Sequence, residues 1–278
     1  MKSSGDKKLQ RTTRREALAF FATSAAGAAV GRTARAAAAP PLPGQPGRMH
    51  RWGMAIDLDR CVRCYACVVA CAAENNIPPL GREKSDKTRP IHWMDMLIPD
   101  ARSAGSELGA APAPIPCMHC ERPECVKVCP VGATYQADDG VVAQIWDRCI
   151  GCRYCMVACP YSRRYFNWTR PEWPGRDPSS ANPDVAIRPV GVVEKCTFCQ
   201  HRIRAALERS RLEELPLVDA DLQKLPACAA TCPSHAITFG DLADPQSAVS
   251  ILAESPRALR LLAHLGTGPK VIYLRGKR

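Results

Sequence analysis

The chain has 278 residues, of which 46% are hydrophobic and only 6% aromatic, and its 25 prolines outnumber its 18 glycines. This composition excludes a collagen, a coiled coil and an all-polar disordered tail, and the length allows one or two domains with a real core. The formal net charge is +11, but residues 1–36 carry eight Lys/Arg against two Asp/Glu, so that +5 remains without them. The rest of the chain contains no nucleic-acid-binding motif that would give this charge a nucleic-acid partner.

The N-terminus has the features of an export signal. Arg14-Arg15 precedes a mildly apolar run rich in Ala and Gly, which ends before Ala34-Arg35-Ala36, a cleavage site of the A-x-A kind. We therefore expect a twin-arginine signal peptide over 1–36, followed by a Pro-rich linker over 37–48. A short amphipathic helix with two ordinary arginines is the alternative. Twin-arginine export carries folded proteins, so the thiols would receive a cofactor in the reducing cytoplasm, which argues against disulfide pairing.

Sixteen cysteines form four groups, and none is left over. The groups are Cys61, Cys64, Cys67 and Cys71; Cys117, Cys120, Cys125 and Cys129; Cys149, Cys152, Cys155 and Cys159; and Cys196, Cys199, Cys228 and Cys232. C-x2-C-x2-C-x3-C, the spacing of the first and third groups, is the bacterial ferredoxin run that ligates [4Fe–4S] clusters, with its last cysteine directed to a neighbouring cluster. A structural zinc protein is the alternative, although a zinc site does not need three thiolates crowded into one short run.

Short β-favouring segments lie beside the groups in chain order. Strands are expected over 54–58, 134–135, 141–146 and 237–239, with a turn at Asp138-Asp139-Gly140 before the third group. No run after residue 36 reaches the eighteen apolar residues that a membrane-spanning helix needs.

Two internal repeats connect these segments. Ala55 and Arg60-Cys61 align with Ala143 and Arg148-Cys149, while Pro123-x-Cys125 aligns with Pro226-x-Cys228. Each unit reads as strand, cluster loop, short helix and strand. Two such units, each lending its last cysteine to the other, would make one two-cluster ferredoxin domain.

The segments between the groups carry weaker signals. Residues 78–116 and 170–190 are loop-like insertions that either dock partner subunits or shield the clusters from water. Residues 201–215 have helical spacing with charges on the other face, which predicts a solvated helix inside the fourth group. Residues 246–278 form a C-terminal extension.

Several polar residues flank the cysteines. His119 and His201 could replace a ligand in principle, but sixteen thiolates already complete four clusters, so we expect both to be neighbours and not ligands. Arg63, Arg153 and Lys195 carry positive charge that should raise the reduction potential of a nearby cluster.

The pattern as a whole resembles the four-cluster iron–sulfur subunit of the dimethyl sulfoxide reductase superfamily and of related quinone-linked complexes. The stretches 149–168 and 191–203, the wider spacing in the second group and the split fourth group carry the resemblance. It implies an α+β fold of two interleaved two-cluster ferredoxin-like domains with loop insertions. The first would comprise 49–80 plus 190–245, and the second 110–170.

In that family the first group pairs with the fourth and the second with the third, and every ligand position here is cysteine. The resemblance therefore implies four [4Fe–4S] clusters. Their ligands would be Cys61, Cys64, Cys67 and Cys232 for cluster 1; Cys196, Cys199, Cys228 and Cys71 for cluster 2; Cys117, Cys120, Cys125 and Cys159 for cluster 3; and Cys149, Cys152, Cys155 and Cys129 for cluster 4.

The chain contains no nucleophile–base pair, phosphate loop or dinucleotide fingerprint, so we expect electron transfer and no catalysis by this chain alone. The resemblance implies two partners, a molybdopterin-type catalytic subunit and a polytopic membrane subunit that handles quinone. The membrane subunit would hold the chain at the periplasmic side, and neither nucleic acid nor a small-molecule substrate of its own is expected. A soluble periplasmic polyferredoxin shuttle is the alternative of another class.

Overall fold

The computed structural model describes residues 50–79, 90–98, 107–109, 111–173, 177 and 180–276. The chain divides into two units, Met1–Ala39 and Pro40–Arg278, and every described residue belongs to the second. The signal peptide expected over 1–36 and the linker expected over 37–48 lie outside the described residues. Within the described ranges, no helix is both long and apolar enough to cross a membrane.

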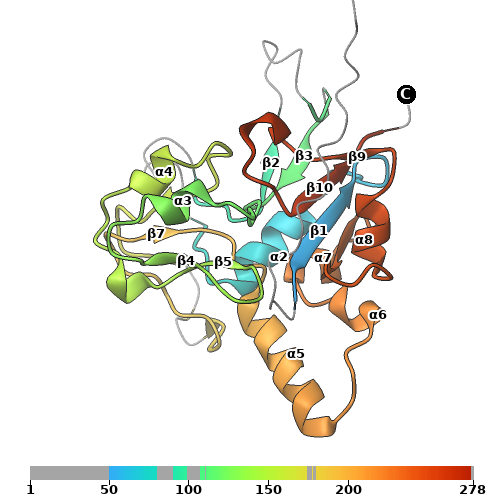
Figure 1. The fold of residues 1–278 in the computed structure, drawn as a ribbon. Coiled ribbons are helices and arrows are strands. Elements are labelled where there is room, and N and C mark those ends of the chain that lie inside the picture. The colour runs from blue at the N-terminus through green and yellow to red at the C-terminus, as the bar shows by residue number, and fades with distance from the viewer. Residues whose placement is uncertain are drawn as a thin grey trace, which may run out of the picture. The chain divides into compact units, whose positions relative to one another are not determined.

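The largest sheet joins the beginning and the end of the described chain. Its strand order is β8–β1–β10–β9, formed by Ile237–Asp241, Trp52–Asp57, Val271–Leu274 and Ala258–Leu259. β8 runs antiparallel to β1 and β10 runs parallel to it, so that β1 is an inner strand (Figure 1). Five of the six β1 residues are buried, which is why this strand is apolar on both faces.

A hairpin repeats the β1–β8 arrangement on a smaller scale. β4 (Thr134–Gln136) pairs antiparallel with β5 (Val142–Gln144), and the expected turn at 138–140 connects them. In the two copies, the Asp57 N–H donates to the Ala236 carbonyl and the Ile145 N–H to the Ala133 carbonyl, each at 2.8 Å. The aligned alanines after the second and fourth groups therefore occupy matching places in space.

Proline sets the length of three of the four helices that carry cluster cysteines. α3 (Glu124–Lys127), α4 (Tyr154–Val157) and α7 (Ala227–Ala230) have four residues each and stop before a Cys-Pro pair. Proline cannot continue a helix because it lacks the N–H and clashes with the preceding turn. Ala72 stands in the corresponding place of the first group, and α2 accordingly runs for nine residues, Ala66–Glu74.

The remaining elements connect and cover these two copies. α5 (Gln200–Glu213) confirms the helix expected over 201–215, and α6 (Asp219–Leu222) follows it inside the fourth group. β2 (Asp95–Leu97) pairs with β3 (Ala113–Ile115), and β6 (Tyr165–Phe166) pairs with β7 (Val193–Glu194). Two 3-10 turns, Trp146–Arg148 and Ala263–Leu265, and the helix α8 (Ala248–Ala253) also belong to this unit.

The C-terminal segment contributes to the core. β10 comes from the extension expected over 246–278, yet it lies beside β1, with Met54 opposite Val271 and Asp57 opposite Leu274. All four β10 residues are buried. A run of Val, Ile, Tyr and Leu needs such a covered position, and the edge of β1 supplies it.

Described parts of both insertions wrap the core. Trp93 and Arg188 are almost fully buried, and both reach the buried carboxylate of Glu194. The Arg188 Nε lies 2.7 Å and the Trp93 Nε1 3.0 Å from the Glu194 Oε2. These contacts support a shielding role for the insertions.

Candidate metal centres

The four C-x2-C loops share one backbone turn. The residue before the second cysteine is left-handed in each loop, with φ of 58° at Arg63, 42° at His119, 69° at Gly151 and 56° at Phe198. Residues other than glycine adopt this conformation uncommonly. Three different side chains and one glycine therefore adopt the same turn, strained for the three, which indicates that the loop geometry serves the cysteines.

A second shared turn follows each Cys-Pro pair. Gly132, Ser162 and His235 stand at matching places and are all left-handed. Close to these turns, backbone N–H groups point at cysteine sulfur. The Thr134 N–H donates to the Cys129 Sγ at 3.4 Å and the Ala236 N–H to the Cys232 Sγ at 3.3 Å. Such bonds stabilise a thiolate more than a thiol.

The cysteines gather in sets, called arrays here, that draw on more than one sequence group. Array 1 comprises Cys61, Cys64, Cys67 and Cys232, which line one common pocket. Met96 of β2, Pro114 of β3 and other residues of the two cysteine loops complete its lining. Burial raises the pKa of the Cys67 thiol to about 12, and the charges of Cys61, Cys232 and Cys64 act in the same direction.

Array 2 comprises Cys71, Cys196, Cys199 and Cys228. Burial raises the pKa of Cys71 and of Cys228 well above the ordinary thiol value, and the charges of Cys196 and Cys199 add to that effect in both. The pKa of Cys196 rises to about 12 from burial and from the charge of Cys117.

Array 3 comprises Cys117, Cys120, Cys125 and Cys159. Burial raises the pKa of the Cys120 thiol, and the charges of the other three reinforce the increase. Array 4 contains Cys149 and Cys155, which interact electrostatically. Of the other two cysteines expected there, Cys152 is exposed and Cys129 is half-buried.

The arrays adjoin one another in numerical order. The charge of Cys67 in array 1 contributes to the raised pKa of both Cys71 and Cys228 in array 2. In the same way, the charge of Cys117 in array 3 raises the pKa of Cys196 in array 2. The charge of Cys125 in array 3 raises the pKa of Cys155 in array 4. The sulfur atoms thus form a continuous series from array 1 to array 4.

The most exposed cysteines lie at the two ends of this series, whereas six others, three of them in array 3, are half-buried. Among all sixteen cysteines, which the structure describes in full, Cys64 and Cys152 alone are exposed. Exposed apolar side chains lie near both in the sequence, and two pairs of them, Val62 with Ile150 and Val69 with Val157, stand at matching places of the repeat. Val62, Tyr65 and Val69 are exposed beside Cys64, and Ile150, Tyr154 and Val157 are exposed beside Cys152.

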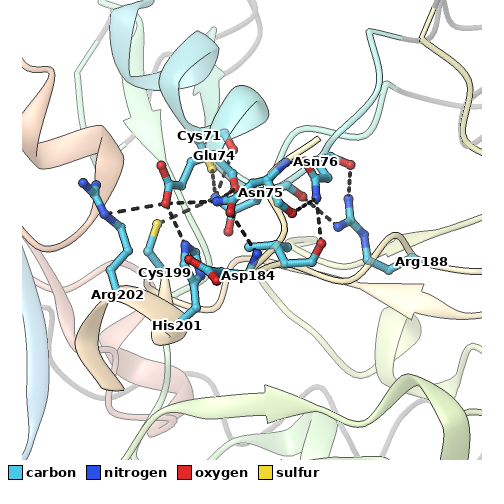
Figure 2. A network of polar contacts seen from close by, with 11 residues as sticks. Cys71, Glu74, Asn75, Asn76, Asp184, Arg188, Cys199, His201 and Arg202 are labelled. Atoms are coloured by element: carbon cyan, nitrogen blue, oxygen red, sulfur yellow. Dashed lines mark hydrogen bonds and ion pairs between the residues drawn. The ribbon is translucent and has the colours of Figure 1, made fainter. Parts of the chain in front are cut away.

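An amide and an ion-pair network surround array 2 (Figure 2). The Asn75 Nδ2 lies 3.7 Å from the sulfur atoms of both Cys71 and Cys199 and 2.9 Å from the Cys71 carbonyl. Arg188 donates to the carbonyl oxygen atoms of Asn75 and Asn76. Asn75 follows the helix turn that the missing proline allows in α2, so this bridging amide was not visible as a motif.

The two flanking histidines have partners other than the arrays. His119 is fully buried, stacks on Phe198 with 3.7 Å between ring centroids, and accepts the Val142 N–H at its Nδ1. Burial and then the charges of nearby cations lower its pKa well below the usual value. His201 pairs with Glu74 at 2.7 Å. Both positions fit neighbours of the clusters, as expected.

The flanking cations divide into surface and buried groups. Arg63 is exposed and donates to the Pro112 carbonyl, and the Arg153 guanidinium lies 4.8 Å from the Trp168 ring centre. Lys195 is buried and donates to the carbonyl oxygen atoms of Val142 and Cys196. Arg164 is a further buried cation, and its NH2 lies 3.1 Å from the Cys125 Sγ. The Arg163-Arg164 pair is visible in the sequence, but its spacing does not indicate which arginine faces sulfur.

The donor chemistry fits iron–sulfur clusters. Soft thiol sulfur gathers in arrays, backbone and amide N–H groups point at it, and buried cations lie beside it. Because burial keeps thiols such as Cys67 protonated, loading with iron would displace protons. In the ranges that the structure describes, no three His, Cys, Asp or Glu side chains are grouped so that they could hold a single metal ion.

Comparison with known protein families locates two iron–sulfur regions. Residues 111–174 match the 4Fe-4S dicluster domain, which covers the second and third cysteine groups. Residues 52–73 match the 4Fe-4S binding domain, which covers β1 and the first group.

Curated relatives match most of the chain. The iron-sulfur cluster-binding subunit of menaquinone reductase from Nitratidesulfovibrio vulgaris is 47% identical over 81% of this chain and 88% of its own. An iron-sulfur subunit of a putative dimethyl sulfoxide reductase from Halobacterium salinarum is 41% identical over 82% of this chain and 80% of its own. One of the chains of polysulfide reductase from Wolinella succinogenes is 34% identical over 82% of this chain and 96% of its own.

Two glycines test whether the loop geometry holds the iron. A Cβ on Gly151 would lie 2.3 Å from the Gly191 carbonyl oxygen, whereas one on Gly132 would meet no atom within 4 Å. Both residues are left-handed, so Gly132→Ala should cost only the conformational strain, about 1–2 kcal/mol, and keep its iron. Gly151→Ala should in addition displace the Cys149–Cys155 loop and lose iron. Iron per chain and the thermal midpoint are the measurements, and equal iron content in both variants would contradict the expectation.

Proposed function

This chain belongs to the iron–sulfur electron-transfer subunits of quinone-linked complexes in the dimethyl sulfoxide reductase superfamily, and we propose that it relays single electrons along arrays 1 to 4 between two partner subunits. Relatives from 34% to 47% identical, matched over most of both chains, support the membership. The chain carries four [4Fe–4S] clusters, each of which accepts and releases one electron when bound.

The ligands of the four clusters are assigned in crossed sets. Cys61, Cys64, Cys67 and Cys232 hold cluster 1, and Cys71, Cys196, Cys199 and Cys228 hold cluster 2. Cys117, Cys120, Cys125 and Cys159 hold cluster 3, and Cys129, Cys149, Cys152 and Cys155 hold cluster 4. The common pocket of array 1 and the mutual electrostatic effects within arrays 2 and 3 support the first three sets. The ferredoxin pattern, in which the last cysteine serves the neighbouring cluster, supports the fourth.

This ligand assignment carries a domain arrangement with it. Residues 49–80 with 190–245 would form one two-cluster ferredoxin-like domain and residues 110–170 the other, so that the second is inserted within the first. The pairing of β1 with β8, from opposite ends of the first domain, and the β4–β5 hairpin of the second support this arrangement.

One observation carries the relay: the arrays adjoin in series, and the two terminal arrays contain the most exposed cysteines. An electron can enter or leave a protein efficiently only where a redox centre approaches the surface. Cys64 and Cys152 mark those two places, and an exposed apolar face surrounds each of them. Exposed apolar patches of this kind favour protein partners.

The two faces accordingly have different partners. The names of the relatives belong to menaquinone, dimethyl sulfoxide and polysulfide reductases, and these names describe complexes with a quinone or another substrate. We assign one face to a molybdopterin-type catalytic subunit and the other to a polytopic membrane subunit that handles quinone. The chain itself then needs no substrate site.

The cellular location follows from the same scheme. A twin-arginine signal over 1–36 would export the chain with its clusters, and the membrane subunit would hold it at the periplasmic side. Arg14-Arg15 and the A-x-A-like site at 34–36 support this route.

The metal content tests the cofactor. We expect about sixteen iron atoms and about sixteen acid-labile sulfides per chain, because four cubes each hold four of both. Broad violet absorption should bleach on reduction with dithionite. Stoichiometric zinc with little iron, measured by elemental mass spectrometry of the purified protein, would replace the relay with a structural zinc protein.

A single substitution tests the crossed ligation. Cys232→Ser should damage the same cluster as Cys61→Ser, since both residues line the pocket of array 1. Electron paramagnetic resonance spectra during a redox titration would identify the cluster signal that each variant loses or converts. If Cys232→Ser instead matches Cys196→Ser, each sequence group ligates its own cluster.

The apolar faces can be tested in pairs. Val69→Asp and Val157→Asp alter matching, exposed positions on α2 and α4, with 67% and 87% exposure. Each should retain its iron but weaken attachment to a different partner, because a charge must then be desolvated in that interface. Leu212→Asp, on exposed α5, is the matched control. Gel filtration of a native membrane extract is the measurement, and a chain that migrates alone without any substitution would favour a soluble polyferredoxin shuttle.

Replacement of Arg14-Arg15 by Lys-Lys tests the export route. The receptor reads the arginine pair, so the variant should remain in the cytoplasm with its clusters intact. Immunoblots of periplasmic and cytoplasmic fractions, with iron measured in each, would follow the protein. Normal periplasmic accumulation of the variant would show that another signal exports it.

A further inference from the structure

Arg164 lies between two cysteine arrays and is one of the most deeply buried charged residues of the described chain. Only 1% of its surface is exposed. Its NH2 donates to the Cys125 Sγ at 3.1 Å, and a side-chain hydrogen bond together with its charge also acts on Cys155. Cys125 belongs to array 3 and Cys155 to array 4. The guanidinium therefore contacts sulfur that we assign to two different clusters.

Neutral groups hold Arg164 in this position. Its NH1 donates to the Thr134 Oγ1 and to the Gln144 Oε1, both at 3.1 Å. Thr134 and Gln144 stand directly opposite each other in the β4–β5 hairpin and are themselves 2.6 Å apart. The hairpin thus fixes one edge of the guanidinium without adding a charge to it, while the other edge faces sulfur.

The buried guanidinium of Arg164 needs an anionic partner. Taking a guanidinium out of water is unfavourable unless a nearby anion compensates. Burial by itself would lower the pKa of Arg164, but the charges of Cys125, Cys155 and Cys117 outweigh that effect and raise it. The sulfur atoms that Arg164 faces become anionic when arrays 3 and 4 hold their clusters, and the guanidinium would then compensate that charge.

A cation beside arrays 3 and 4 affects how readily their clusters are reduced. A cluster that accepts an electron becomes more negative, so a fixed positive charge and an N–H···S bond stabilise the reduced form more than the oxidised form. We propose that the charge of Arg164 acts on clusters 3 and 4 together and raises the reduction potentials of both. This inference rests on the ligand sets given under the proposed function.

Arg163 provides a matched control at the adjacent position. It is also a buried arginine, but its NH1 pairs with the Asp95 carboxylate at 3.1 Å and its Nε donates to the carbonyl oxygen atoms of Tyr161 and Ser162. A substitution there removes a buried charge of the same kind from the same segment without removing a side-chain donor to cluster sulfur.

The test is a redox titration of the complete complex followed by electron paramagnetic resonance. Cys125→Ser and Cys155→Ser first identify the signals of clusters 3 and 4. Arg164→Gln keeps N–H donors but removes the charge, and both of those midpoint potentials should fall while those of clusters 1 and 2 stay unchanged. Arg163→Gln should leave all four in place. Arg164→Lys keeps the charge without the fork, so both potentials should fall by a smaller amount.

Three results would overturn the inference. They are unchanged potentials in Arg164→Gln at full iron content, a shift confined to one of the two clusters, and an equal shift in Arg163→Gln. If Arg164→Gln does not assemble, Arg164→Met, which also removes the charge, decides the question, because unchanged potentials of both clusters in that variant would overturn the inference. Failure of the proposed function is a separate outcome. It would be recognised before any Arg164 variant is measured, by iron far below sixteen atoms per chain or by loss of the same signal in Cys125→Ser and Cys155→Ser.

Discussion

The gathering of sixteen thiols in adjoining arrays, eight of them buried, is the constraint on which the rest of this structure depends. Thiolate sulfur and the clusters it holds carry negative charge, and the interior solvates charge poorly. In this fold, hydrogen-bond donors directed at sulfur compensate that negative charge. Backbone N–H groups bond Cys129 and Cys232, the Asn75 amide bridges two further sulfur atoms, and Arg164 brings a full positive charge. The left-handed turns of the loops lie close to the backbone N–H groups that bond Cys129 and Cys232.

The internal repeat is preserved where the chemistry is local and broken where the two copies meet their surroundings. Cys-Pro ends α3, α4 and α7 after four residues, whereas Ala72 lets α2 continue to Glu74 and places Asn75 against array 2. The donors beside the arrays also differ, with a neutral amide at array 2 and a guanidinium between arrays 3 and 4. One ferredoxin pattern, used twice, can therefore give clusters with different electrostatic surroundings.

Described parts of the insertions and the C-terminal segment help to cover the series, and all four cysteines of array 2 are buried. Trp93, Arg188 and Glu194 form a buried network over Asn75, and β10 covers the inner edge of β1. Cys64 and Cys152 remain exposed among apolar side chains. A conductor between two partners needs this combination, because water around its middle would stabilise charge on single sites and offer electrons an exit to solutes.

The amino-acid sequence by itself determined the type of cofactor, the repeat, the positions of the main strands and the place of α5. These features depend on residues close together in the chain: cysteine spacing shapes a loop, and proline ends a helix. Only the tertiary structure decided which distant segments meet. The family resemblance implied that Cys232 joins Cys67, and the pairing of β8 with β1 is the contact that brings them to one pocket. Arg164 rather than Arg163 faces sulfur because the β4–β5 hairpin holds its guanidinium. Contacts across such sequence separations arise from packing, and no local pattern encodes them.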